Sequence, residues 1–398
     1  MTNLFDYLTW RGDLTFTQDP PNGVDALIFA ALAYVPLGGR AVTQPWTPIT
    51  LRQAAQETLS MPRLEQLART KNDIALLRAA AETTRFGLNR LCRYRSQLIP
   101  EQDTQFAAVT FLLDDGSMML AYRGTDNSLV GWKEDFNMSF QETVPAQRLA
   151  AQYLKDVAAE HGVPMRVCGH SKGGNLAVFA AASAPPMVQR RILEVYNHDG
   201  PGFSGAFLRS PGYQNLVSRI HTLIPQSSVI GMLLEHEDPY TVIRSKSVGI
   251  MQHDPYSWEV IGAGFLPMED VTENSQFLDA TIKAWCAGMT NEERGKLVDA
   301  LFALLSTAEV ERAVEIFHPK NLRTYIKTLS GDETLRKLLS GEFLGLVEAA
   351  KATKQRLEAA KQEPEGEGEE ACAGNPTSLT KDMGDILCKS PKISKDQL

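Results

Sequence analysis

Residues 169 to 173 read Gly-His-Ser-Lys-Gly, a pattern that can place a serine to attack a carbonyl group. The apolar segment Met165–Cys168 predicts a strand before the pattern, and the alanine-rich segment Asn175–Ala184 predicts a helix after it. Such a strand-turn-helix corner raises the serine hydroxyl above the end of a sheet, and the flanking glycines allow the sharp turn. We therefore predict that Ser171 is a nucleophile; the alternative is a serine that only caps the helix.

A serine hydroxyl becomes a good nucleophile when a histidine accepts its proton. Three of the seven histidines remain as candidates, because the others precede Ser171, lie inside the motif or fall in a predicted strand or the C-terminal helices; they are His198, His236 and His253. His253 lies in a loop after the last predicted strand, which is the usual place of the base when the chain order is serine, acid, histidine. We predict His253 as the general base.

The base also needs a carboxylate that holds it in the right tautomer. Asp199 ends the strand predicted after the nucleophile helix, and the Gly-Pro-Gly that follows would present it at the active edge of a sheet. We predict Asp199 as this acid, with an ordinary turn aspartate as the alternative. Glu235 and Asp238 are nearer to His253 in the chain and are alternative candidates for the acid.

Acyl transfer also requires two backbone N–H groups that stabilise the oxyanion, one from the residue after the nucleophile and one from an earlier loop. Lys172 supplies the first amide. Gly124 ends a predicted strand and would let the amide of Thr125 approach as the second. Arg123 beside it either supports this loop or is only structural.

The elements that must position these residues follow from the apolar periodicity. Residues 48–94 have helical spacing, and strands and helices then alternate as a hairpin, a helix, a strand, the elbow and its helix, and two further strands: Phe106–Leu113, Met118–Tyr122, Pro145–His161, Met165–Cys168, Asn175–Ala184, Ile192–Tyr196 and Ser218–Ile224. This alternation predicts an α/β fold with a mainly parallel central sheet and helices on both faces.

We expect four parts along the chain. Residues 1–100 form a helical lead-in packed on the core, residues 101–271 form the core with the catalytic residues, and residues 272–362 form a helical C-terminal extension. Residues 363–398 hold eight acidic and four basic residues among Pro, Gly, Ser and Lys, which predicts a disordered tail. The apolar run Ala26–Leu37 is too short to cross a bilayer and predicts a buried helix.

Composition limits the partners. The net charge of −8 argues against sequence-independent binding of nucleic acid, which needs a basic face. Five scattered cysteines suggest neither a disulfide framework nor a zinc site, and the N-terminus lacks the pattern of a signal peptide, so we expect a cytoplasmic protein. No metal-binding motif is present, and no cofactor is expected. The oligomeric state is left open.

Several of these residues together resemble a known group of enzymes. Arg123-Gly124-Thr125, Trp132, Asp135 and Gly169 to Gly174 resemble the fungal-type class-three lipases, which are α/β-hydrolases. A wider set of motifs is similar to a bacterial lipase-like branch of that superfamily: Trp10-Arg11-Gly12-Asp13, Gly131 to Phe136, Gly169 to Asn175, Asp199 to Gly202 and Gln252-His253-Asp254. The resemblance covers Asn3 to Leu329.

The resemblance implies an α/β-hydrolase fold, with Thr125 at the oxyanion hole, Ser171 as nucleophile and His253 as base. It also implies that residues 128–140 correspond to a mobile lid, where Trp132 and Phe136 would offer surface for peripheral contact with lipid. Arg123 and Asp135 would steady the oxyanion loop.

The chain departs from the lipases at two positions. Lys172 stands where they have leucine after the nucleophile, and this charge could pair with Asp135 or with a substrate anion. Residues 225–229, where the lipases place their catalytic aspartate, contain no carboxylate. The acid must therefore come from elsewhere, for which Asp199 is our prediction, or the triad is incomplete.

We thus predict a serine hydrolase that cleaves carboxylic esters of small molecules or acyl lipids through an acyl-enzyme. A thioesterase or amidase would use the same groups. The alternative to an enzyme is a binding or scaffold protein. It would have a hydrolase fold that has lost catalysis, and it would act through its C-terminal helices and acidic tail.

Overall fold

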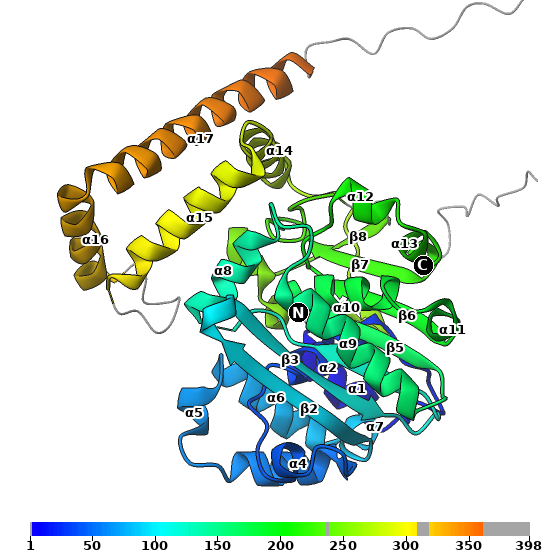
Figure 1. Cartoon of the computed structure of the whole chain (residues 1–398). Coiled ribbons are helices and arrows are strands. Elements are labelled where there is room, and N and C mark those ends of the chain that lie inside the picture. Colours follow the sequence, from blue (N-terminus) through cyan, green and yellow to red (C-terminus); the bar gives the residue numbers. More distant parts are fainter. Residues whose placement is uncertain (1, 127, 236–238, 309–317, 361–398) are drawn as a thin grey trace, which may run out of the picture. The chain divides into compact units, whose positions relative to one another are not determined.

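The central element is an eight-stranded sheet (Figure 1). The structure is a computed structural model, and it describes residues 2–126, 128–235, 239–308 and 318–360. The strands lie in chain order, antiparallel from β1 to β4 and parallel from β4 to β8. They are β1 (Ile49–Thr50), β2 (Arg90–Ile99), β3 (Thr104–Leu112), β4 (Met118–Tyr122), β5 (Met165–His170), β6 (Ile192–His198), β7 (Ile220–Pro225) and β8 (Tyr240–Ile243); β9 (Val260–Ile261) and β10 (Gly264–Phe265) form a separate ribbon. The predicted mainly parallel α/β sheet is confirmed.

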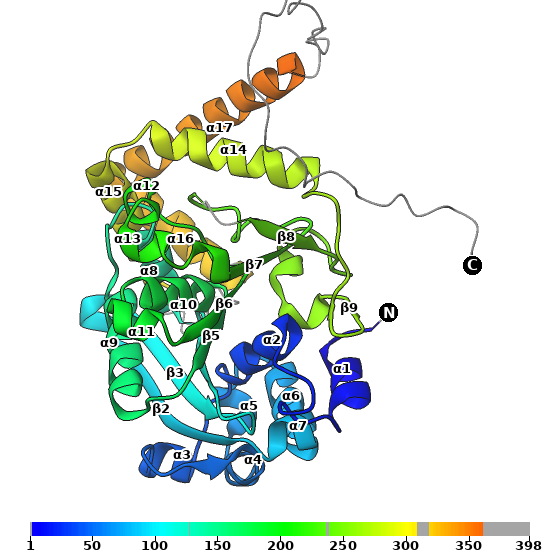
Figure 2. The same cartoon turned by 90° about the vertical axis from the view of Figure 1, so that its right-hand side faces the viewer.

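Helices cover both faces of the sheet (Figure 2). Residues of the N-terminal helices share one apolar core with the sheet: α1 (Leu4–Arg11), α2 (Gly23–Leu32), α3 (Arg40–Thr43), α4 (Leu51–Leu59), α6 (Lys71–Glu82) and α7 (Thr84–Gly87), with α5 (Leu64–Leu67) between them in the chain. The helices that follow β4 build the other core: α9 (Pro145–Glu160), α10 (Lys172–Ala182), α11 (Pro186–Gln189), α12 (Gly205–Leu208) and α13 (Pro211–Gln214).

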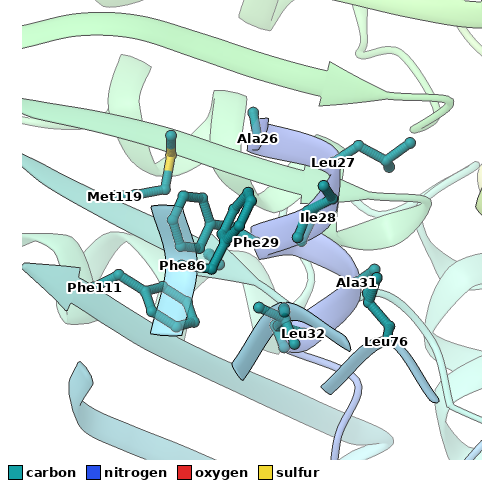
Figure 3. Packing of buried hydrophobic residues seen from close by; sticks show 14 of the residues in the cluster. Ala26, Leu27, Ile28, Phe29, Ala31, Leu32, Leu76, Phe86, Phe111 and Met119 are labelled. Atoms are coloured by element: carbon teal, nitrogen blue, oxygen red, sulfur yellow. The ribbon is translucent and has the colours of Figure 1, made fainter. Parts of the chain in front are cut away.

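The side chains of β4 show why two cores form. Met119 and Ala121 belong to the core around α2, whereas Met118, Leu120 and Tyr122 belong to the core around α9 and α10. This alternation follows from the period of two in a strand. Figure 3 shows the first core, where Phe29 of α2 lies between Phe86 and Phe111; the ring centroids are 5.1 and 4.6 Å away. The expected buried helix is thus present.

Five strands of the described residues were not anticipated: the two-residue strands β1, β9 and β10, and the longer strands β2 and β8. Residues 90–99 form β2, so the lead-in is not helical throughout its length as expected. Its sequence includes three arginines among the apolar residues, which masks the strand alternation. β8 was missed because it has only four residues, of which Tyr240 and Thr241 are exposed. Short strands at a sheet edge leave little periodicity to detect.

The C-terminal extension is helical in the described residues, as predicted. It contains α14 (Glu273–Ala287), α15 (Asn291–Ser306), α16 (Pro319–Gly331) and α17 (Glu333–Ala360). The tail predicted to be disordered, residues 363–398, lies outside the described residues. Of the helices that are described, none is long and apolar enough to span a membrane.

Candidate active site

Ser171 lies at a sharp corner between β5 and α10. Its backbone has φ 60° and ψ −135°, a region that costs a residue with a Cβ atom strain energy. The corner is closed by a hydrogen bond from the Ser171 N–H to the His198 carbonyl, 2.9 Å long. A Cβ at Gly169 would lie 2.0 Å from the Gly173 carbonyl oxygen, so the close approach of strand and helix requires glycine there. This is the elbow geometry expected from the motif.

Asp199 and His253, which are 54 residues apart in the chain, are brought together. The Nδ1 atom of His253 lies 2.6 Å from Oδ2 of Asp199. Asp199 follows β6, is fully buried and also has a positive φ of 53°, while His253 ends the short 3-10 helix η3 (Gly249–His253). An Nδ1–H donated to the carboxylate leaves Nε2 as the free, proton-accepting nitrogen, which is the tautomer that a general base needs.

The second carboxylate oxygen of Asp199 is also held. Oδ1 accepts a 2.5 Å hydrogen bond from the Ser228 hydroxyl and a 3.2 Å bond from the Gly231 N–H. Ser228 belongs to residues 225–229, the segment in which the resembling lipases carry their acid. The carboxylate of Asp199 therefore reaches from the end of β6 to the segment after β7, and a serine there orients it.

Among the described residues, neither the alternative acid Glu235 nor the alternative base His198 replaces this pair. Glu235 is exposed, and its backbone pairs with that of Phe203. The ring nitrogens of His198 face the carbonyl oxygens of Gly23 and Gly169 at 3.0 and 3.3 Å, so this buried ring is engaged in the core. His236 and Asp238 lie outside the described residues.

The loop expected to complete the oxyanion site adjoins Ser171. A Cβ placed on Gly124 would lie 3.1 Å from the Cβ of Ser171, so residues 123–125 pass directly beside the nucleophile. The Thr125 hydroxyl donates a 2.5 Å hydrogen bond to Oδ2 of Asp135, which lies on α8 (Leu129–Asn137). Burial is the largest effect on Asp135 and raises the pKa of its carboxyl to about 6. Arg123 Nη2 lies 3.3 Å from Asp126 and supports the same loop.

Lys172 begins α10, so its N–H faces away from the helix and is free of intrahelical bonds. Its side chain is directed into the core. Nζ lies 3.0 Å from Glu134 Oε2 and 3.6 Å from Asp135 Oδ1, and it donates to both the carbonyl and the side-chain oxygen of Gln105. The predicted pairing with Asp135 is therefore secondary to Glu134, which sequence reasoning did not select. Because the ammonium is fully engaged, it does not face a substrate anion.

His170 contacts the segment that carries the base. Its Nε2 lies 2.8 Å from the His253 carbonyl oxygen, and Nδ1 lies 3.1 Å from the Tyr34 hydroxyl. A carbonyl only accepts, so Nε2 carries the proton and Nδ1 accepts from Tyr34. The rings of His170 and His253 are 4.6 Å apart between centroids. Burial lowers the pKa of His170 well below its ordinary value, which keeps this bridge neutral.

The neutral state of His170 predicts a pH dependence of stability. Because the folded pKa is depressed, the unfolded chain binds a proton below about pH 6.5 that the folded chain cannot bind, so stability is present above that pH and is lost as the pH falls. His170→Gln should reduce the slope of unfolding free energy against pH between 6 and 4.5 by up to about 1.4 kcal/mol per pH unit. Urea unfolding at several pH values measures this slope, with the partly exposed His161→Gln as control. Equal slopes in wild type and His170→Gln would contradict the assignment.

Metal ligands do not gather within the described part of the chain, where no group of three or more His, Cys, Asp or Glu side chains could hold an ion. A hydroxyl at a strained corner, an imidazole oriented by a buried carboxylate and backbone amides at a helix start form a set suited to acyl transfer.

Comparison with known proteins identifies one family and several similar solved structures, two of which are described below. The family model described as Mbeg1-like matches residues 80–303. Among solved structures, the chain is similar to M37 lipase, with 13% identity and a TM-score of 0.36 over 61% of this chain and 84% of that one. It is also similar to the Rhizomucor miehei lipase in its propeptide complex, with 14% identity and a TM-score of 0.33 over 58% of this chain and 76% of that one. No curated protein matches the chain.

Proposed function

Since this chain belongs to the Mbeg1-like family, a lipase-like family, and has an α/β-hydrolase fold, we propose that it is a serine hydrolase that cleaves carboxylic esters through an acyl-enzyme. Ser171 is the nucleophile, His253 the general base and Asp199 the acid that orients it. The amides of Lys172 and Thr125 bind the oxyanion. We further propose that residues 101–271 carry the reaction and that residues 272–362 are accessory to it.

One observation carries the proposal: the 2.6 Å contact between Asp199 Oδ2 and His253 Nδ1, where Asp199 follows β6 and Ser171, in the elbow conformation, follows the adjacent parallel strand β5. Burial of the Asp199 carboxylate costs desolvation free energy, and such costly arrangements are frequent at functional sites. Orientation of a general base is a function that this carboxylate can perform here. The side chain of His253 is 25% exposed, so a substrate can reach it from solvent.

The reaction follows from these roles. His253 Nε2 takes the proton of the Ser171 hydroxyl while the oxygen attacks the ester carbonyl, and the Lys172 and Thr125 amides stabilise the oxyanion. The tetrahedral intermediate collapses, His253 returns the proton to the leaving alcohol, and the acyl group stays on Ser171. Water, deprotonated by His253 Nε2, then attacks the acyl carbonyl, and His253 returns this proton to the Ser171 oxygen as the carboxylic acid leaves.

The acyl-enzyme can be detected directly. Mixing the protein with p-nitrophenyl butyrate should give a burst of p-nitrophenol close to one equivalent, followed by a slower steady rate, if deacylation limits turnover. Mass spectrometry of the quenched sample should find the butyryl group on the peptide that contains Ser171. An acyl group on any other residue, or turnover with no adduct under several quench times, would contradict the mechanism.

The same assay separates the alternative activities. Matched butyryl ester, thioester and amide substrates differ only in the leaving group, so the ratio of their kcat/KM values measures preference among the three classes. We expect the ester to be preferred. A chain that hydrolyses none of the three and forms no adduct would instead support the scaffold function, for which the accessory helices would be the binding surface.

A further inference from the structure

The ion pair between Lys172 and Glu134 is buried almost completely. The two side chains are 1% and 0% exposed, with 3.0 Å between Nζ and Oε2. Burying two charges is expensive unless every donor and acceptor is satisfied. Here Nζ has three partners, since it also bonds the Gln105 carbonyl at 3.1 Å and the Gln105 side-chain oxygen at 2.9 Å.

Glu134 is satisfied in the same way. Its Oε2 accepts from the Gln105 N–H at 3.0 Å, and its Oε1 accepts from the Ala146 N–H at 2.8 Å. One carboxylate on α8 thus joins the start of β3, the start of α9 and the residue that follows the nucleophile. Moving α8 away from the core would leave a buried ammonium without its carboxylate and two backbone N–H donors, those of Gln105 and Ala146, without their acceptor.

The outer side of α8 is held by the C-terminal extension. Lys133 lies 3.0 Å from Asp299 of α15, and the Phe136 ring is 5.8 Å from that of Phe302 between centroids. Arg294 of α15 donates a 2.8 Å hydrogen bond to the Ser139 carbonyl just after α8. α8 is therefore held on both faces. A lid that opens on a hinge would instead have to detach from the core.

We propose that α8 stays docked during turnover, that Lys172 and Glu134 are positioning residues for the oxyanion loop, and that the site therefore takes acyl esters dissolved as single molecules rather than esters at a lipid–water interface. The link to the loop is Asp135, the neighbour of Glu134, which accepts from Thr125. This inference rests on the proposed hydrolase function for its substrate class. It departs from the mobile lid that the sequence resemblance implied.

Hydrogen exchange of the full chain tests the docking of α8 without any turnover. We expect the amides of Leu129–Asn137 to be protected equally with and without detergent micelles. Lys172→Met should raise their exchange rate at least tenfold, because it leaves Glu134 buried and unpaired. Lys133→Met makes the same change on the outer side of α8, where the partners are more exposed, and should have a much smaller effect. Faster exchange of wild-type α8 on addition of micelles would overturn the proposal.

Kinetics test the positioning and the substrate class. Tributyrin hydrolysis should saturate smoothly and show no break at the solubility limit, whereas a several-fold jump above that limit would overturn the inference. Lys172→Met and Glu134→Gln should each lower kcat by about 10²-fold with KM changed less than threefold, as expected for loss of oxyanion stabilisation.

The double variant Lys172→Met/Glu134→Gln removes both charges. Its fold-loss in kcat should be smaller than the product of the fold-losses of the two single variants. Additive losses, or single variants with unchanged kcat, would refute the positioning role. If no variant and no wild-type sample hydrolyses any ester, the proposed function fails, while the exchange experiment still decides whether α8 is fixed.

Discussion

Ser171→Ala should abolish covalent labelling by a fluorophosphonate probe and lower the kcat for p-nitrophenyl butyrate by roughly 10⁴- to 10⁶-fold. The probe forms a stable bond only with an activated serine, because the reaction needs both the general base and the oxyanion site. Gel fluorescence and intact-mass spectrometry measure the labelling, and a stopped-time assay measures the residual turnover. This is the largest effect that the proposed mechanism predicts.

The matched control is Ser183→Ala, which removes a serine hydroxyl at the other end of the same helix, α10. It should label and turn over like the wild type. Labelling that persists at full stoichiometry in Ser171→Ala would move the nucleophile to another residue and remove the basis of the proposed function. Circular dichroism of both variants should match the wild type, since the deleted hydroxyl contributes little to folding.

Asp199→Asn should lower kcat by roughly 10³- to 10⁴-fold and leave KM nearly unchanged. The amide keeps the shape of the side chain but cannot stabilise the imidazolium, and it presents an N–H group that favours the wrong tautomer of His253. Glu235→Gln makes the same chemical change on an exposed residue and should cost less than threefold. Steady-state kinetics with p-nitrophenyl butyrate compare the two, and equal losses would refute Asp199 as the acid.

The contact with Ser228 offers a stricter test of the same assignment. Because its hydroxyl is 2.5 Å from Asp199 Oδ1, exchanging the two residues in Asp199→Ser/Ser228→Asp places a carboxylate after β7 and a hydroxyl after β6. We expect the exchange to recover at least tenfold of the kcat lost in Asp199→Ser alone. No recovery in a well-folded double variant would show that position 228 cannot present a carboxylate to His253.

The central sheet was predictable from the sequence where its pattern is local and strong. β4 is apolar throughout, whereas the segments predicted as the other three strands, Phe106–Leu112 in β3, Met165–Cys168 in β5 and Ile192–Tyr196 in β6, each contain a single polar or charged residue. Glycine marks the elbow at the end of β5. β2 and β8 were not predictable, because arginines interrupt one and the other is four residues long. Their pairing in the sheet depends on neighbours that are distant in the chain, and tertiary contacts commonly override weak local signals.

For the site, residue type and chain order were enough to select Ser171, Asp199 and His253, whose catalytic roles stay predictions. The supporting partners were not accessible in this way. Glu134 and Asp135 are adjacent carboxylates, and only the rotation of about 100° per residue in α8 decides which one meets Lys172. His170 lies inside the motif, and no sequence signal indicates that its ring contacts the carbonyl group of His253.

The order of the strands has a consequence for the timing of assembly. Since each strand of the sheet pairs with the next one in the chain, we expect the sheet to grow from its amino-terminal edge as the polypeptide leaves the ribosome. The residue that should accept the proton arrives only after the eighth strand. A nascent chain can therefore bury most of its core before it gains any power to cleave a substrate.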